Sequence, residues 1–254
     1  MIKLLLTSFV ILTFSFAAHA QLTALVKATF VGCNSDGQVG PLPAPTDSGR
    51  APLIPQTFAQ DLAFYEPEHG VGTLAPRGWY CFGYYGSSGA FLIVSPDPAY
   101  GKDYLTTIPE ITGPAIQIIV DDAETSGRFG VAAIDARLFP SQRKFVEKII
   151  AENIEPASAF PFGPYPNDII IRRSDYDVSF ETPANKDGMG TAGADTDSYL
   201  RKNNYPILGE AFIVGDGPNI EGAITLDIRL PPNLRYLAPI IFSTERQSAV
   251  PPGQ

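Results

Sequence analysis

Apolar and polar residues alternate along much of this chain, and a period of two residues is typical of β-strands. Across Asp175–Glu181, aromatic and aliphatic residues alternate with acidic and hydroxyl residues, as in a strand with one buried face. Four more runs predict two hairpins, at Trp79–Tyr85 with Ala90–Ser95 and at Ile207–Gly215 with Glu221–Leu230. The first pair is joined by Gly-Ser-Ser-Gly, a short turn sequence.

Further strands are expected at Leu25–Gly32 and Asp168–Arg173, and a third hairpin at Ala115–Asp121 with Phe129–Leu138. Only three segments favour a helix. Ser141–Ile154 places its apolar residues at helical spacing between a capping serine and Pro156. A shorter helix is expected to open at the capping box of Thr57, and another to close the fold at Pro231–Leu237.

These patterns predict an α+β fold class: a mainly antiparallel sheet built from hairpins, with two or three short helices. The 24 prolines and 23 glycines of the 254 residues agree with many short elements separated by turns. Residues 34–56 and 183–197 read as loops.

The N-terminus has the pattern of a secretory signal peptide. Lys3 precedes an apolar run, and Ala18-His19-Ala20 is a small-x-small cleavage sequence. We therefore expect a signal peptide at 1–20, a single domain at 21–246 and a flexible tail at 247–254. No later run is apolar enough to cross a bilayer, so the expected location is periplasmic or extracellular, and the protein is not expected to be membrane-embedded.

Charge and motif content narrow the possible partners. With 18 basic and 27 acidic residues the formal charge is −9, which argues against a nucleic-acid partner, because phosphate binding needs clustered Lys and Arg. Neither a dinucleotide-binding glycine motif nor a phosphate-binding P-loop is present. The acidic loop near Gly188 does not fit the spacing of an EF-hand. We expect no cofactor and no metal.

The two cysteines, Cys33 and Cys81, are expected to form one disulfide outside the cytosol. The alternative is a thiol nucleophile, whose only imidazole partner after removal of the leader would be His69. One histidine is also too few for a multi-histidine zinc site.

Two groups of residues are candidates for binding. The aromatic ribbon Trp79–Tyr85 supplies Trp79, Tyr80, Tyr84 and Tyr85, whose rings pack in a core or recognise sugars and proteins. The acidic stripe supplies Asp175 and Asp177. Paired carboxylates serve as acid and base in glycoside hydrolysis or as oxygen ligands for Ca²⁺, although a solvated strand face shows the same pattern.

Two segments, Gly32–Gln38 and Ala75–Ser87, resemble segments of bacterial exported proteins that carry no assigned function. This resemblance implies a secreted or periplasmic bacterial protein in which Cys33 and Cys81 belong together. It implies no catalytic residue.

The sequence therefore favours an exported, non-catalytic domain that binds a protein, a peptide or a cell-envelope glycan. The alternative is a secreted, carboxylate-dependent hydrolase that acts on a saccharide. The two differ in one feature, because a hydrolase needs a concave pocket that gathers two carboxyls.

Overall fold

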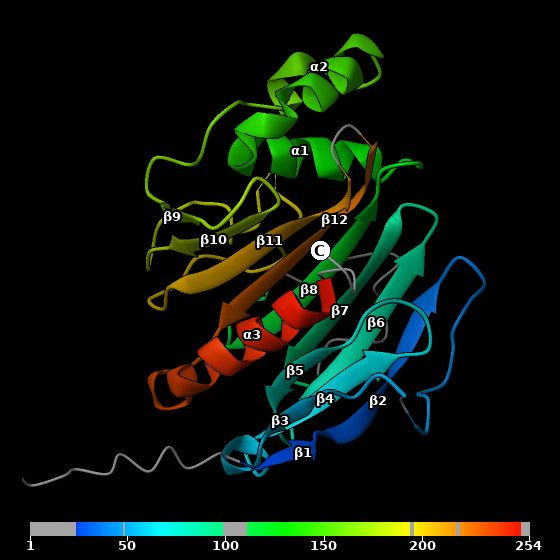
Figure 1. Ribbon diagram of the computed structural model, residues 1–254, viewed down its shortest axis with the longest axis vertical. Helices are drawn as coiled ribbons and strands as arrows, with labels where there is room; N and C mark the ends of the chain where they lie inside the picture. The colour runs from blue at the N-terminus through cyan, green and yellow to red at the C-terminus, as the bar shows by residue number, and fades with distance from the viewer. Residues whose placement is uncertain (1–23, 48, 99–110, 194–195, 217–218, 250–254) are drawn as a thin grey trace, which may run out of the picture.

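The computed structural model describes residues 24–47, 49–98, 111–193, 196–216 and 219–249. The expected signal peptide lies outside these residues, as do the last five residues of the expected tail. A ten-stranded sheet forms the centre of the molecule, in the order β5-β4-β2-β6-β7-β8-β12-β11-β10-β9 (Figure 1). Neighbouring strands are antiparallel, except that β2 runs parallel to both β4 and β6.

The strands fall along the whole chain. Those of the sheet are β2 (Thr29–Gly37), β4 (Leu62–Pro67), β5 (Thr73–Pro76), β6 (Tyr80–Gly86), β7 (Gly89–Ser95), β8 (Ala115–Asp122), β9 (Ile169–Arg172), β10 (Asp177–Thr182), β11 (Ile207–Asp216) and β12 (Asn219–Arg229). A separate pair is formed by β1 (Leu25–Lys27) and β3 (Leu53–Pro55).

Helices are short and few in the described ranges. They are α1 (Arg128–Leu138), α2 (Arg143–Ala151) and α3 (Ala238–Ala249), with 3-10 turns η1 (Gln56–Phe58), η2 (Pro140–Gln142), η3 (Ala157–Ala159) and η4 (Pro232–Leu237). The predicted α+β class, mainly antiparallel with few short helices, is confirmed. No helix within the described residues has both the length and the apolar character needed to cross a membrane.

Strand β2 changes partners halfway along its length. Residues Thr29–Cys33 pair with β4, whereas Asn34–Gly37 pair with β6. Cys33 lies at this change of partner and is bonded to Cys81 of β6, with an S–S distance of 2.02 Å and Cα atoms 5.4 Å apart. The predicted disulfide is confirmed. The chain has two cysteines and both are in this bond, so the expected alternative of a thiol nucleophile is wrong.

Strands β4 and β5 fold back over the sheet instead of extending it. Their residues are buried on both faces and share one core with Leu92, Ile118 and Leu226 of the central strands. The close approach depends on Gly83 of β6, because a Cβ there would lie 2.7 Å from the Cβ of Pro67. Helix α3 covers the same side of the sheet, in front of β8 in Figure 1.

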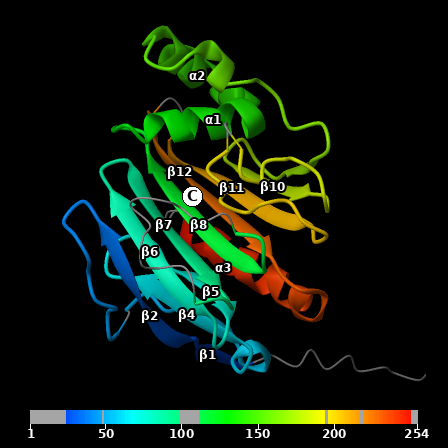
Figure 2. The same cartoon turned by 180° about the vertical axis from the view of Figure 1, so that it is seen from behind.

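We call this side the α3 face and the opposite side the α1 face. Helix α1 packs its Val131, Ile134 and Leu138 against β10, β11 and β12 on the α1 face. This face of the sheet is turned toward the viewer in Figure 2, where α3 lies behind the strands. Buried Arg229 points to this face and donates hydrogen bonds to the carbonyl oxygens of Gly113 and Ile111, at 2.8 and 2.7 Å, and to that of Arg201.

Two expected elements are wrong, and the expected loop at 34–56 contains the end of β2 and all of β3. The segment expected to be a helix from Thr57 is a 3-10 turn followed by β4, because its run of Leu62–Tyr65 is buried on both sides, and periodicity cannot assign such a run. Phe129–Leu138 is helix α1, not a hairpin strand: its residues at spacings of three and four form the buried stripe. The hairpins β6–β7 and β11–β12 are confirmed, and α3 continues to Ala249.

The disulfide generates the first prediction. Its cysteines are 48 residues apart, so chain entropy gives it about 4 kcal/mol of stability. Replacing both cysteines with serine should lower the melting midpoint by about 8–16 °C, as measured by circular dichroism. Wild-type protein under reducing conditions should match the variant. An unchanged midpoint in both would contradict the prediction.

Candidate functional site

The aromatic ribbon contributes more to the core than to the surface. Tyr80 is exposed, and Trp79 is half-buried against the core of the α3 face. Tyr84 is half-buried on the α1 face, where its ring stacks on Phe91 at 5.3 Å. Tyr85 is buried and its hydroxyl donates to the carbonyl oxygen of Gly40 at 2.7 Å. The four side chains therefore do not form one exposed binding face.

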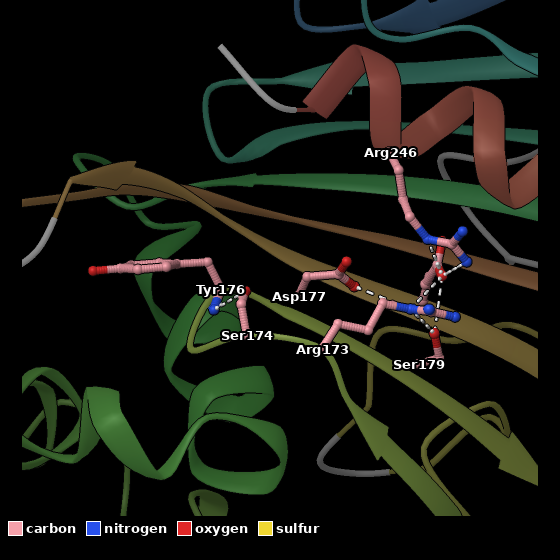
Figure 3. Close-up of polar contacts among 7 residues, drawn as sticks. Arg173, Ser174, Tyr176, Asp177, Ser179 and Arg246 are labelled. Carbon is pink, nitrogen blue, oxygen red and sulfur yellow. Dashed lines mark hydrogen bonds and ion pairs between the residues drawn. The ribbon is translucent and has the colours of Figure 1, made fainter. Parts of the chain in front are cut away.

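The acidic stripe lies far from this ribbon. Strands β7, β8, β12 and β11 separate β6 from β10, which amounts to roughly 24 Å at about 4.8 Å per strand. Asp175 is exposed before β10, whereas Asp177 is half-buried and lies 4.0 Å from the guanidinium of Arg173 (Figure 3). The structure does not bring the predicted aromatic and acidic residues together.

Asp177 belongs to a network that the sequence did not reveal. Buried Glu210 accepts hydrogen bonds from the Arg246 side chain of α3, including one from its Nε at 2.7 Å, and from the Ser179 hydroxyl at 2.9 Å. The Arg173 guanidinium lies 3.6 Å away. Figure 3 shows Arg246 reaching from α3 toward Arg173 and Ser179. Two arginines thus balance Glu210 and Asp177.

A cavity of about 220 Å³ lies on the α3 face, next to this network. It is lined by the segments that lead into β3 and β5, by strands β4, β8, β11 and β12, and by α3. Most of its wall is apolar and is formed by Pro52, Phe64, Val71, Ile118, Phe212 and Ile224. Such a wall, interrupted by a few polar groups, is typical of small-molecule sites.

Three charged side chains reach this cavity: Arg50, Glu66 and Glu245. The Glu66 carboxylate is buried and lies 2.5 Å from the Arg50 guanidinium, which is largely exposed. Arg50 also donates a hydrogen bond to the carbonyl oxygen of Gly70 at 3.2 Å. The Arg50–Glu66 ion pair is therefore positioned where the cavity meets solvent.

Glu245 of α3 is the third charged residue, and its carboxyl has no cationic partner among the described residues. Burial raises its pKa to about 7, and the negative charge of Glu210 adds to the rise. The buried Thr73 hydroxyl lies near the Glu245 carboxyl and acts to lower its pKa, although the two groups do not form a hydrogen bond of normal geometry. Glu245 can therefore carry either a proton or a charge near neutral pH.

The α1 face holds a second set of buried acids. Asp227 accepts a hydrogen bond from the Gln117 amide at 2.7 Å, and burial raises its pKa to about 7. Burial and the neighbouring charge of Asp197 raise the pKa of Asp121 to about 8. On α1, burial alone raises the pKa of Asp135 to about 8. No group of acidic, histidine or cysteine side chains in the described ranges has an arrangement that could hold a metal ion.

Glu66 and Glu245 were missed because each lies in a segment whose sequence pattern points elsewhere. Glu66 follows an apolar run that was assigned to a helix, and Glu245 lies beyond the last expected helix. The polar run Ser-Thr-Glu-Arg-Gln-Ser, which follows the apolar Ile-Ile-Phe, is the sign of an amphipathic helix here.

The raised pKa values predict how stability depends on pH. Unfolded carboxyls ionise near pH 4, whereas Asp121, Asp135, Asp227 and Glu245 keep their protons in the fold up to about pH 7–8. Their stabilising effect is therefore complete below about pH 4 and is lost as the pH rises through 7–8. The melting midpoint should be higher at about pH 5.5 than at about pH 8.5, by several degrees.

Asp135→Asn should reduce this pH dependence, because the amide stays neutral at both pH values. Asp47→Asn, at an exposed position, serves as its control and should leave the dependence unchanged. Calorimetry that gives equal midpoints for wild-type protein at the two pH values would refute the assignment of buried, protonated carboxyls.

No family model, no curated protein and no solved structure matches this chain significantly. The function must therefore be inferred from the chemistry of the site.

Proposed function

We propose that this protein is an exported, non-catalytic binding protein that holds a small ligand in the cavity of the α3 face. The observation that carries this proposal is the cavity itself: an apolar hollow of about 220 Å³ that contains buried charged side chains. A cavity with apolar walls and few polar groups gains affinity by burying a ligand's apolar surface and orients it through those groups.

Export is part of this proposal. The leader pattern at 1–20 supports it, and a disulfide that links β2 to β6 suits an oxidising compartment. The periplasm and the extracellular medium both meet this requirement. The excess of acidic residues favours cationic over anionic partners.

The wider expectation of a protein, peptide or glycan partner has weaker support. Of the predicted binding residues, Tyr80 and Asp175 are exposed, but they belong to distant parts of the sheet. A macromolecular partner needs a continuous surface with buried anchor residues. We therefore favour the cavity over the ribbon and the stripe as the principal site.

One observation favours a second function, hydrolysis of a saccharide. Glu66 and Glu245 line the same cavity in different surroundings, one paired with Arg50 and the other without a cation among the described residues. Two carboxyls in contrasting environments are the arrangement that acid–base catalysis requires. Such a hydrolase would release reducing ends from a glycan, and a binding protein would not.

The binding proposal predicts that a small apolar probe raises the melting midpoint. Cyclohexanol should do so for the wild-type protein, because a ligand that binds the native state alone stabilises it. Val71→Phe, which fills the cavity from its wall, should abolish the shift. Val39→Phe, the same change at an exposed position, should retain it. No shift in the wild-type protein, or equal shifts in both variants, would refute the proposal.

Export predicts a shorter mature chain. Protein isolated from the periplasm or culture medium of its native cell should begin at Gln21, as intact-mass spectrometry and N-terminal sequencing would show. Recovery of an uncleaved leader on protein located in the cytosol would contradict it.

A further inference from the structure

We propose that the ligand of the α3-face cavity is a small organic cation: a protonated amine on a compact apolar body. The proposal rests on the binding function proposed above and specifies the chemistry of its ligand. Three features of the cavity carry it: its size, its balance of charge, and the position of Glu245 against an apolar wall.

The volume limits the ligand to a small molecule. An apolar cavity of about 150 Å³ accommodates benzene, with six carbon atoms, whereas drug-sized ligands occupy about 300–1,000 Å³. A cavity of about 220 Å³ therefore suits a molecule of about seven to ten non-hydrogen atoms. A ligand held wholly within the cavity is therefore far smaller than a folded peptide.

The cavity is lined by more acidic than basic side chains. Glu66 and Glu245 contribute two carboxyls, and Arg50 contributes one guanidinium, which already lies 2.5 Å from Glu66. The next arginine, Arg246, is bound to Glu210. A positive ligand restores the balance, because an ammonium beside Glu245 supplies the partner that its carboxylate lacks. An anionic ligand would place a third negative group in the same hollow.

The surroundings of Glu245 favour a ligand that places a cation, rather than a neutral hydroxyl group, beside its carboxylate. Its neighbours are the Thr73 hydroxyl on β5 and the negatively charged Glu210 on β11. Glu66 and Arg50 line the same cavity. Desolvation strengthens a charge-assisted hydrogen bond between an ammonium and a carboxylate, so this pair is worth more here than in water.

Binding of an amine should therefore depend on pH. Burial gives Glu245 a pKa of about 7, so about a tenth of this group is ionised at pH 6 and about nine-tenths at pH 8. An alkylamine, like lysine, stays protonated throughout this range. Affinity for the amine should thus rise about tenfold between these two pH values, whereas affinity for a neutral analogue should stay nearly constant.

The test compares three probes of the same shape with the full mature protein: cyclohexylamine, cyclohexanol and cyclohexanecarboxylate. Isothermal titration calorimetry at about pH 6 and about pH 8 gives the affinities. We expect cyclohexylamine to bind at least about tenfold more tightly than cyclohexanol at the higher pH, and this preference to shrink at the lower pH. The carboxylate should bind most weakly.

Glu245→Gln should remove the preference for the amine over cyclohexanol, together with the pH dependence of that preference. Glu68→Gln makes the same change of charge at an exposed position near the cavity, so it should behave as the wild-type protein. If Glu245→Gln does not fold, the pH series on wild-type protein alone decides, since it needs no variant.

The outcomes separate this proposal from the one on which it rests. Equal binding of cyclohexylamine and cyclohexanol at both pH values would overturn the cation proposal and leave the binding function standing. Tightest binding of the carboxylate would also overturn it and would identify Arg50 as the anchor. Binding of none of the three would overturn the binding function itself.

Discussion

The change of partner within β2 is the constraint on which the rest of the structure depends. One half of this strand pairs with β4 and the other half pairs with β6. In the described ranges, β2 is therefore the one strand through which β4 and β5 join the central sheet. The Cys33–Cys81 bond fixes this position covalently. From here β4 folds back over the α3 face, where its Phe64 and Glu66 form part of the cavity wall.

Covering the sheet on both faces has an electrostatic consequence. In many antiparallel sheets one face is exposed to solvent, but the central strands here bury the side chains of both faces. Acidic residues on β8, β11 and β12 are therefore inside the protein: Glu210 is matched by arginines, whereas Asp121 and Asp227 depend on neutral partners or a bound proton. A chain rich in acidic residues thus keeps some of them in the interior, where burial raises their pKa.

Sequence reasoning succeeded where a local pattern decides the structure. Two cysteines left one intramolecular pairing, and glycine-containing turns with alternating strands located the hairpins of β6–β7 and β11–β12. It failed where burial depends on distant partners. The run in β4 is apolar on both sides because β5 and the sheet enclose it, and nothing in its own periodicity distinguishes it from a helix.

The candidate site was harder to predict than the fold. The raised pKa of Glu245, on α3, depends on its burial and on Glu210 and Thr73, which lie on two strands. The cavity that it lines is built from five helices and strands. The predicted residues Asp175 and Asp177 were chosen because an alternating acidic strand is visible in one line of sequence, but Asp177 is balanced by Arg173. When the residues of a site come from segments more than a hundred residues apart, no single segment contains a sequence motif that identifies the site.

Arg229 has a mechanical consequence for the α1 face. Its guanidinium joins three carbonyl oxygens, two from the segment before β8 and one from the segment before β11. Lysine could not substitute, since a single ammonium lacks the planar fork that spans them. The two connecting segments therefore share one anchor, so that loss of this guanidinium would remove a hydrogen-bonded support from both.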